Sequence, residues 1–364
     1  MNKSKKNTCN KINKKSLKNK LGQGTFGLVY KYCTKDGCYG IKFLTMKNKY
    51  VLDNTHPGNV EALIGLELLK LKIPHVNYVI KHDYCKINEL KKLDIFKDDK
   101  WYTDVLEKYK NKIIYPNIKI IFNELADSDL KKYVTLNELS LDTHIILLFY
   151  FCYTLSSIQY HLKNFRHNDI KPNNILVKYN KHYKPNTYDV YIIFNKTFYI
   201  PCLPFTIKIH DFDYCYCSKY KNQKIMGYKS KKSKTKQFGT STIVNPVYDL
   251  HEYVNFSLRD YKTLSEPIME FYKSLIPFNT IGKGGTPDKY CNRYKLTSYH
   301  IDKKYNYIPS DMRSPSQLLL SLKEFDKFLV KPSNQIKNKE YNSNIELNSK
   351  IQKRNDMFNL QFNL

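Results

Sequence analysis

The sequence predicts an α+β protein with a small β-rich first part and a larger helical second part. Short runs of β-branched and aromatic residues punctuated by glycine dominate residues 21–43. After Asp129 the apolar residues favour helix, and the long apolar stretch from 141 to 162 predicts a buried one. A chain of 364 residues, 41% of them apolar, is long enough for two such parts around a sizeable core.

Further elements follow from local patterns. Residues 60–72 carry leucines at helical spacing, so we expect a helix there. Residues 86–112 are rich in lysine, and we interpret them as an inserted, mostly solvated helical segment without a functional role. Ser314 and Pro315 match an N-cap followed by a first-turn proline. The closing helix that they begin would bury one face, formed by Leu318, Leu319, Leu322, Phe325 and Leu329.

Two segments rich in lysine and asparagine contain too few apolar residues to offset the entropy lost on ordering. We therefore expect a disordered basic tail at 1–19 and a mostly disordered tail at 332–364. The domain between them would cover 20–331, with the β-rich part at 20–125 and the helical part at 126–331.

The chain carries 61 basic and 33 acidic residues, a formal net charge of +28, and only five of the basic residues are arginine. A surface built for nucleic acid would be expected to use arginine, whose planar fork matches phosphate and base edges. Lysine that abounds together with asparagine, tyrosine and isoleucine instead suggests the codon bias of an AT-rich genome. We expect no dedicated nucleic-acid site, although such a charge attracts polyanions in general.

The nine cysteines show no CxxC pair, so we expect no disulfide framework and a reducing compartment. The most apolar stretch, residues 145–153, is about half as long as a bilayer span, and the N-terminus lacks the apolar core of a signal peptide. We therefore expect a soluble, intracellular protein without a membrane span.

Three glycines, Gly22, Gly24 and Gly27, form the pattern G-x-G-x-x-G in LGQGTFGLVY. A dinucleotide-binding fold uses the same spacing, but there the glycines open a helix. Here Leu28 and Val29 continue as strand-type residues, which places the glycines in a hairpin. Without a Cβ such a turn can approach a triphosphate closely, and a plain glycine turn is the alternative.

Lys42 lies within the apolar run CYGIKFL, where a lone charge is costly unless an anion pairs with it. Glu61, which opens the helical segment, is the partner we favour, and it would hold the ammonium toward the α and β phosphates. Glu67 on the same helix is the rival, and an exposed surface charge is the alternative for either carboxylate.

The segment HNDIKPNN at 167–174 matches H-x-D-x-K-x-x-N and contains separable chemical roles. Asp169 can accept the proton of an incoming hydroxyl, and Lys171 can neutralise charge on a transferring phosphoryl group. Asn174 can ligate Mg²⁺.

Asp211 follows another apolar strand in the sequence IHDFD and is the expected main metal ligand. Oxygen donors from Asp211 and Asn174 suit Mg²⁺ bound together with phosphates rather than zinc. We therefore interpret the nearby Cys215 and Cys217 as bystanders.

These motifs resemble the eukaryotic-type protein kinase family over the whole region between the tails. The resemblance implies a bilobal fold, in which a small β-rich N-lobe and a larger helical C-lobe enclose a cleft for ATP and Mg²⁺. It implies that Asp169 is the catalytic base, that Lys42 pairs with Glu61, and that Asn174 and Asp211 hold magnesium. The glycine turn that would cover ATP comprises Leu21, Gly22, Gln23, Gly24, Thr25, Phe26, Gly27, Leu28 and Val29.

The segment ELADSDLKKY, 124–133, resembles the family's hinge and the helix after it. There the backbone from Glu124 to Ala126 would meet adenine, and Asp129 would meet the ribose. Lys171 resembles the serine/threonine branch. The DFD triplet, the segment YDLHEYV and the ending SPSQLLLSLKEFDKFL look most like divergent kinases of poxviruses and other large DNA viruses.

Several departures from the family pattern limit the resemblance. Asn168 stands where most members have arginine, so the usual pocket for an activation-loop phosphate is absent. Asp213 replaces the glycine of the DFG triplet and adds a negative charge near the site, and the APE triplet is missing. The chain between the two metal-binding segments is longer than in the family, so we interpret 179–205 as an inserted hairpin. Asp249 looks like the buried aspartate that anchors the catalytic loop, with a helix-capping carboxylate as the alternative.

The activity implied is phosphoryl transfer from ATP to serine or threonine hydroxyls of protein substrates, with the chain itself among the candidates, in the host cytoplasm or in a virion. A pseudokinase scaffold that binds nucleotide or a partner without turnover is an alternative, motivated by Asp213. A small-molecule phosphotransferase is disfavoured by Lys171 and Pro172, and a nucleic-acid binder would depend on the lysines of 229–236. The sequence indicates no oligomeric state.

Overall fold

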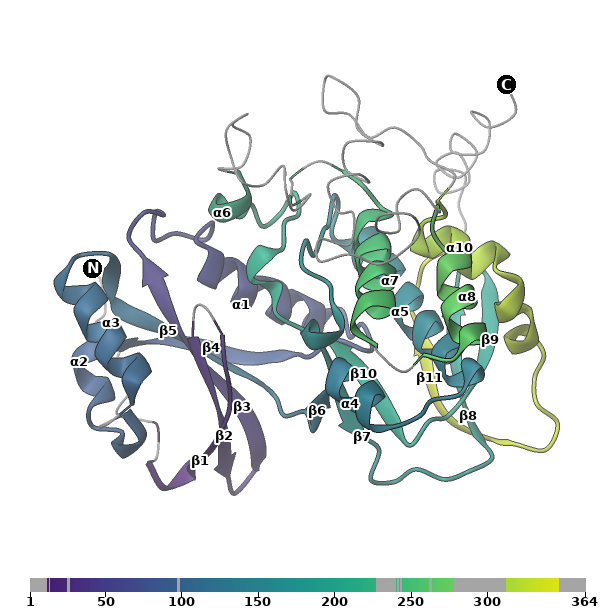
Figure 1. The fold of residues 1–364 in the computed structure, drawn as a ribbon, viewed down its shortest axis with the longest axis horizontal. Helices are drawn as coiled ribbons and strands as arrows, with labels where there is room; N and C mark the ends of the chain where they lie inside the picture. Colours follow the sequence, from purple (N-terminus) through teal and green to yellow (C-terminus); the bar gives the residue numbers. More distant parts are fainter. Residues whose placement is uncertain are drawn as a thin grey trace.

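The computed structural model of the chain describes residues 12, 14–24, 27–96, 99–226, 240, 242, 244–261, 264–277 and 312–346. The architecture is mixed α+β, as predicted, with a β-rich N-terminal region beside a mainly helical C-terminal region (Figure 1). The lysines at 229–236, on which the nucleic-acid alternative depends, lie outside the described residues.

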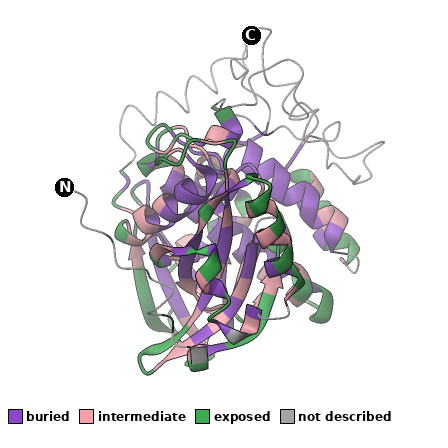
Figure 2. Ribbon diagram, turned by 90° about the vertical axis from the view of Figure 1, so that its left-hand side faces the viewer, coloured by how far each residue is buried: buried purple, intermediate pink, exposed green. Residues whose placement is uncertain are grey.

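An antiparallel sheet with strand order β1-β2-β3-β5-β4 forms the N-terminal region. Its strands are β1 (Leu17–Gln23), β2 (Gly27–Thr34), β3 (Gly37–Lys47), β4 (Val79–Lys86) and β5 (Ile114–Glu124). The helix expected at 60–72 is α1 (Pro57–Lys70), which packs against the sheet. It begins after His56, whose ring nitrogen accepts a hydrogen bond from the N–H of Gly58. Figure 2 shows buried residues concentrated between sheet and helices, with exposed residues along the outside.

The segment 86–112 contains helices, as we expect, but one side of it is buried, so the expectation that it is mostly solvated is wrong. It contains α2 (Ile87–Leu90), a 3-10 turn at Asp94–Phe96 and α3 (Lys100–Lys110). These pack on the sheet, where Phe96 meets Phe43 edge to face with ring centroids 5.0 Å apart. The lysine content misled us because most of the lysines lie on the outer side. The inner side carries seven buried residues, Ile87, Leu90, Leu93, Phe96, Trp101, Tyr102 and Val105.

Cys33 and Cys38 form a disulfide across the hairpin between β2 and β3. The two residues are directly opposite one another in the sheet register, and their Cα atoms are 4.0 Å apart. Our expectation of no disulfide framework did not anticipate this bond. Hairpin register, which a search for CxxC spacing ignores, brings the two thiols together.

Five α-helices of seven or more residues lie in the described part of the C-terminal region. They are α4 (Leu130–Leu136), α5 (Leu141–His161), α7 (Tyr248–Asp260), α8 (Glu266–Ser274) and α10 (Pro315–Ser321). Helix α5 is the buried helix that the apolar stretch predicts. By length and composition it passes the test for a bilayer span, contrary to our estimate from the sequence, but 83% of its most apolar window is buried inside the protein. It packs against α8 and α10, as the core helix of a folded region does.

Two three-stranded sheets complete the C-terminal region, in the orders β10-β7-β6 and β11-β8-β9. The first contains β6 (Ser128–Asp129), β7 (Ile175–Tyr179) and β10 (Phe205–Ile209). The second contains β8 (Thr187–Ile193), β9 (Lys196–Pro201) and β11 (Ile336–Asn342). Strands β8 and β9 are the hairpin that we expect within 179–205.

Parts of both segments that we expect to be tails form regular structure. Strand β11 lies inside the segment expected to be a tail from residue 332, where it pairs in parallel with β8. At the other end, a 3-10 turn at Lys14–Ser16 and the start of β1 lie within 1–19. Both corrections have the same cause, because pairing with a strand from elsewhere in the chain stabilises a polar segment that could not order alone.

The closing helix is shorter than its apolar spacing predicts. Ser314 caps α10 in a capping box with Gln317, as the sequence indicates. The helix ends at Ser321, Leu322 is extended, and a 3-10 helix follows over Lys323–Leu329. Leu322 and Phe325 are buried as expected, so the pattern marks the core-facing residues correctly but not the break between them.

Candidate functional site

A cavity of about 1070 Å³ lies where the N-terminal sheet meets the C-terminal region. Most residues singled out from the sequence line it, namely Leu21, Gly22, Gln23, Gly24, Gly27, Val29, Lys42, Glu61, Glu124, Ala126, Asp129, Asp169, Lys171, Asn174 and Asp211. Leu28 does not, because its side chain is buried in the core of the sheet. Thr25 and Phe26 lie outside the described residues.

The glycine turn joins β1 to β2, and its three glycines have different surroundings. A Cβ added at Gly22 or Gly24 would meet no atom within 4 Å. A Cβ at Gly27 would lie 2.1 Å from the carbonyl oxygen of Phe43 on β3. Gly27 is therefore required by strand packing, whereas Gly22 and Gly24 leave open space on the cavity side that a phosphate group could enter.

Lys42 links the two regions across the cavity. It sits in the central strand β3, and its Nζ lies 2.7 Å from Oε1 of Glu61 and 2.7 Å from Oδ1 of Asp211. The expected contact with Glu61 is thus present. Glu67 is not the partner, since its carboxylate bonds to Lys219 and Tyr220 instead.

Charge and burial act against one another in this cluster. Burial favours the neutral form of Lys42, but the carboxylates of Asp211, Glu61 and Asp213 outweigh it and raise the pKa of the lysine. Burial raises the pKa of Glu61 to about 7, although Lys42 opposes the shift. Burial would also raise the pKa of Asp211, but Lys42 overcomes it, and the pKa of that carboxyl lies below its usual range. Asp211 is therefore the carboxylate of this cluster that stays ionised most firmly.

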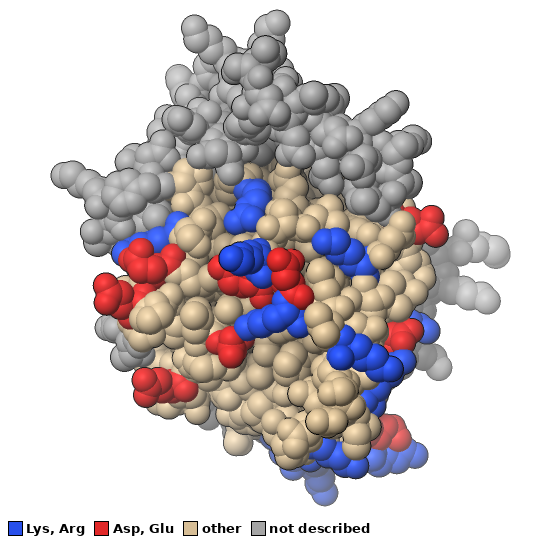
Figure 3. Space-filling view, turned by 90° about the vertical axis from the view of Figure 1, so that its right-hand side faces the viewer, with Lys and Arg blue, Asp and Glu red and all other residues tan. Residues whose placement is uncertain are grey.

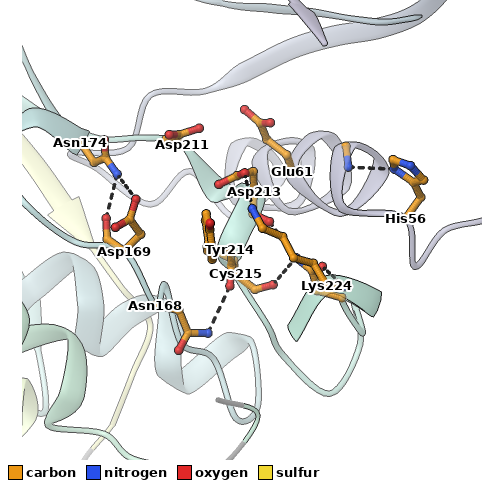
Figure 4. A network of polar contacts seen from close by, with 12 residues as sticks. His56, Glu61, Asn168, Asp169, Asn174, Asp211, Asp213, Tyr214, Cys215 and Lys224 are labelled. Carbon is orange, nitrogen blue, oxygen red and sulfur yellow. Dashed lines mark hydrogen bonds and ion pairs between the residues drawn. The ribbon is translucent and has the colours of Figure 1, made fainter. Parts of the chain in front are cut away.

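The loop 167–174 holds Asp169 by its own side chains. The ammonium of Lys171 lies 2.8 Å from Oδ2 of Asp169. Nδ2 of Asn174 donates to the same oxygen at 2.9 Å and to the carbonyl oxygen of Asp169 at 2.8 Å. Because the amide nitrogen of Asn174 faces Asp169, its oxygen points away and remains available to a cation. Figure 4 shows Asp169 and Asn174 in this arrangement.

Acidic side chains of helix α7 bind the backbone of the same loop. Asp249, fully buried, accepts hydrogen bonds from the backbone N–H of His167 at 2.9 Å and of Asn168 at 3.0 Å. The anchoring position suggested by the family resemblance is therefore present. Glu252, one turn further on, accepts from the N–H of Ile170 at 2.9 Å, which our sequence reasoning missed. Its spacing of three residues from Asp249 on one helix was the available signal.

Strand pairing brings Asn174 and Asp211 to one end of a sheet. Strands β7 and β10 are antiparallel with Ile175 opposite Ile209, so the residues just before β7 and just after β10 are neighbours. Asp211 adopts a left-handed backbone, with φ 67° and ψ 61°. That conformation is unfavourable for a residue with a side chain, and it persists where the surrounding structure enforces it, often at functional sites.

The oxygen donors of Asp211 and Asn174 fit a hard cation such as Mg²⁺. Within the described ranges no group of three or more histidine, cysteine or carboxylate side chains is arranged to hold a metal by itself. A cation here would thus rely on two protein ligands together with oxygens of a bound phosphate, which is the usual arrangement for Mg²⁺.

The deeper wall of the cavity also fits a polar ligand. Oε2 of Glu61 and Oδ1 of Asn77 are buried and have no hydrogen-bond partner. At the cavity edge, Glu124 ends β5 and binds Lys208 at 2.6 Å. Asp129 caps α4 by accepting from the N–H of Lys132 at 2.9 Å, so one of its oxygens is already engaged.

Asp213 is matched by a cation that the sequence did not reveal. Its Oδ2 lies 2.9 Å from Nζ of Lys224, on the short helix α6 (Gln223–Met226). Burial and the neighbouring Asp211 raise the pKa of Asp213, and Lys224 opposes that shift. Nothing local predicts this pair, since 11 residues separate the two side chains and no helix or strand contains both.

Outside the cavity, acidic and basic side chains are mixed. On the face shown in Figure 3, groups of Asp and Glu lie directly beside groups of Lys and Arg. The excess positive charge of the chain is therefore not collected into one continuous patch among the described residues of that face.

The α+β architecture and this cavity are compatible with a kinase-like fold. No family model matches the chain. Over 166 residues the chain is 31% identical to a protein of Acanthamoeba polyphaga mimivirus described as "Putative serine/threonine-protein kinase R400". The aligned region covers 44% of this chain and 35% of that protein, so the chain spans about a third of the length of the relative it matches. The similarity supports a kinase-like family for the chain.

Proposed function

We propose that the chain is a bilobal serine/threonine protein kinase that transfers the γ-phosphoryl group of ATP to a protein hydroxyl with the help of Mg²⁺. One observation carries the proposal. Lys42, Asp169, Asn174 and Asp211 come from three separate segments and line one cavity. The similarity to a viral protein of that description supports the same conclusion.

The residues of the cavity have distinct roles in this proposal. Lys42, held between Glu61 and Asp211, would bind phosphate oxygens. Asp169, oriented by Asn174, would accept the proton of the substrate hydroxyl, and Lys171 would offset the charge that develops beside it. Asn174 and Asp211 would hold Mg²⁺, which supplies charge neutralisation on the phosphates. Most of the acceleration would then come from positioning and electrostatics.

Isotope-labelled ATP tests the proposal directly. We expect the purified chain with Mg²⁺ and ATP to label itself or an added protein on serine or threonine, as mapped by mass spectrometry. Asp169→Asn should fold and lose label transfer by at least about 100-fold. Asp142→Asn, which changes an exposed carboxylate of α5, is the matched control and should keep full activity. Equal transfer by parent and Asp169→Asn rejects the proposal.

A scaffold that binds nucleotide without turnover is the second candidate. Asp213 favours it, because it adds a carboxylate to the lining of the cavity where phosphates would bind. This candidate predicts that Mg·ATP raises the melting temperature of the chain while no label is transferred to any protein. Label transfer that depends on Asp169 excludes it.

A further inference from the structure

The short helix α6 contacts both structures that hold Lys42. It follows the segment after Asp211, and it also lies against the loop that precedes α1, the helix carrying Glu61. In Figure 1, α6 lies next to the start of α1. Two successive residues of α6, Gln223 and Lys224, make these contacts.

Lys224 fixes the segment after Asp211. Its ammonium lies 2.9 Å from Oδ2 of Asp213 and 3.1 Å from the centroid of the Tyr214 ring. The side chains of Lys224 and Asp213 are only 7% and 11% exposed. The fully buried Asn222 adds backbone contacts, donating to the carbonyl oxygens of Asp213 at 2.9 Å and of Cys215 at 3.0 Å. Figure 4 shows the side chain of Lys224 extending toward Asp213.

Gln223 fixes the entry to α1. Its side chain accepts from the N–H of Val51 at 2.8 Å and donates to the carbonyl oxygen of Val51 at 3.1 Å. Its backbone N–H donates to the carbonyl oxygen of Thr55 at 2.9 Å. The next residue, His56, is the N-cap of α1, and Glu61 lies in the first turns of that helix. Gln223 thus holds the end of the helix from which Glu61 reaches Lys42.

We propose that Lys224 and Gln223 are positioning residues for the phosphoryl transfer proposed above. Lys224 acts through Asp213, and Gln223 acts through the loop before α1. The inference rests on the proposed function for its effect on turnover, but the contacts themselves are those of the unmodified chain. These contacts therefore form without phosphorylation of the chain.

The charge of Lys224 matters because of where Asp213 lies. Without a partner, Asp213 would be a buried carboxylate near both Asp211 and Lys42, and it would attract the ammonium of Lys42 away from Asp211. Removing the carboxylate together with the lysine should relieve that competition. The positioning role therefore predicts that loss of Lys224 is harmful mainly while Asp213 is present.

Four variants test this role. Lys224→Met should lower kcat about 10- to 100-fold with a smaller change in KM for ATP, and Lys224→Arg should retain most of the activity. The double variant Asp213→Asn/Lys224→Met should recover at least about tenfold of the loss. Lys221→Met, which removes an exposed lysine of the same segment, is the matched control and should behave like the parent. A double variant no better than Lys224→Met overturns the positioning role.

Hydrogen exchange supplies a readout that needs no turnover. In Gln223→Ala the N–H of Val51 loses its acceptor, so a peptide covering 48–56 should exchange about tenfold faster. In Lys224→Met the peptide 211–218 should do the same, and Lys221→Met should leave both unchanged. Unchanged exchange in the first two variants overturns the inference. If exchange responds as expected but the parent transfers no phosphate, the links to α1 and Asp213 stand and the proposed function is what fails.

Discussion

Nζ of Lys42 lies 2.7 Å from Oδ1 of Asp211, although 169 residues separate the two in the sequence. Lys42 belongs to the central strand of the N-terminal sheet, and Asp211 follows strand β10 of the C-terminal region. The contact therefore measures how the two regions lie relative to one another. A change that moves α1 or the segment after Asp211 should affect this contact even if it touches neither residue.

Loss of Asp249 should destabilise the loop that contains Asp169. Asp249→Ala leaves the N–H groups of His167 and Asn168 buried without acceptors, and each such group costs about 1 to 3 kcal/mol. We expect the free energy of unfolding, measured in urea, to fall by about 2 to 5 kcal/mol. Asp142→Ala is the control, since its carboxylate is 77% exposed and its ion pair should contribute less than about 1 kcal/mol. Similar losses in the two variants would contradict the anchoring role.

The three glycines of the turn should respond differently to alanine. Gly27→Ala places a methyl group against the carbonyl oxygen of Phe43 and should lower the free energy of unfolding by about 1 to 3 kcal/mol without any ligand. Gly24→Ala has open space around it and should leave that quantity within about 0.5 kcal/mol of the parent.

The effect of Gly24→Ala should become visible when nucleotide is added. Gly24→Ala should reduce the rise in melting temperature caused by Mg·ATP, because its methyl group enters the space proposed for phosphate. A calorimetric titration with Mg·ATP checks this directly. If Gly24→Ala binds as tightly as the parent, the turn does not cover the phosphates.

Motifs that depend on close spacing were the part of the site that the sequence could reveal. The residues of the loop 167–174, and those of the glycine turn, lie within ten positions of one another, so the sequence alone shows which chemical groups come together. Glu61 could be favoured over Glu67 but not chosen, because the choice depends on which turn of α1 faces β3.

The missed features depend on contacts between distant segments. Lys224 neutralises Asp213 only because the chain after Asp211 folds back on itself. Strand β11 is as polar as a tail, and only its partner β8 makes it a strand. Lysine content was also a poor guide at 86–112, where one buried face outweighs many solvated charges. Composition describes what a segment exposes, and it does not show what a second segment covers.

His75 should make the fold sensitive to acid. The ring is buried, bonds to Thr206 and Tyr191 at 2.8 Å each, and stacks on Tyr150. Burial, assisted by the nearby positive charge of Lys208, lowers the pKa of His75 from 6.5 to about 3. Below pH 6.5 the unfolded chain therefore binds a proton at His75, whereas the folded chain does not. The stabilising effect of the neutral ring is complete above pH 6.5 and is lost as the pH falls toward about 3.

The size of this effect follows from the linkage between protonation and folding. Between pH 6.5 and 5, the free energy of unfolding of the parent should fall by about 2 kcal/mol because of His75. His75→Gln cannot titrate, so the stability difference between parent and variant should narrow by that amount from pH 7 to pH 5. Urea unfolding at the two pH values measures it. A difference that does not change with pH would mean that His75 titrates in the folded protein as it does in the unfolded chain.

The contacts of β11 should stabilise the C-terminal region. Tyr341 stacks on Tyr191 with ring centroids 4.8 Å apart, and its carbonyl oxygen accepts from the hydroxyl of Tyr153. Asn338 donates to the carboxylate of Asp189 at 2.8 Å. We expect Tyr341→Ala to lower the free energy of unfolding by about 3 kcal/mol, and Asn338→Ala to lower it by about 1 kcal/mol.

An exposed lysine on the same strand provides the comparison. Lys337 forms an ion pair with Glu340 at the surface and its side chain is 51% exposed, so Lys337→Ala should leave the free energy of unfolding close to that of the parent. Thermal unfolding of the three variants under one set of conditions checks the order. If all three match the parent, β11 adds nothing to stability, and residues beyond 332 behave as the tail that their composition predicts. If Tyr341→Ala alone is strongly destabilised, packing on Tyr191 rather than the hydrogen bond to Asp189 holds the strand in place.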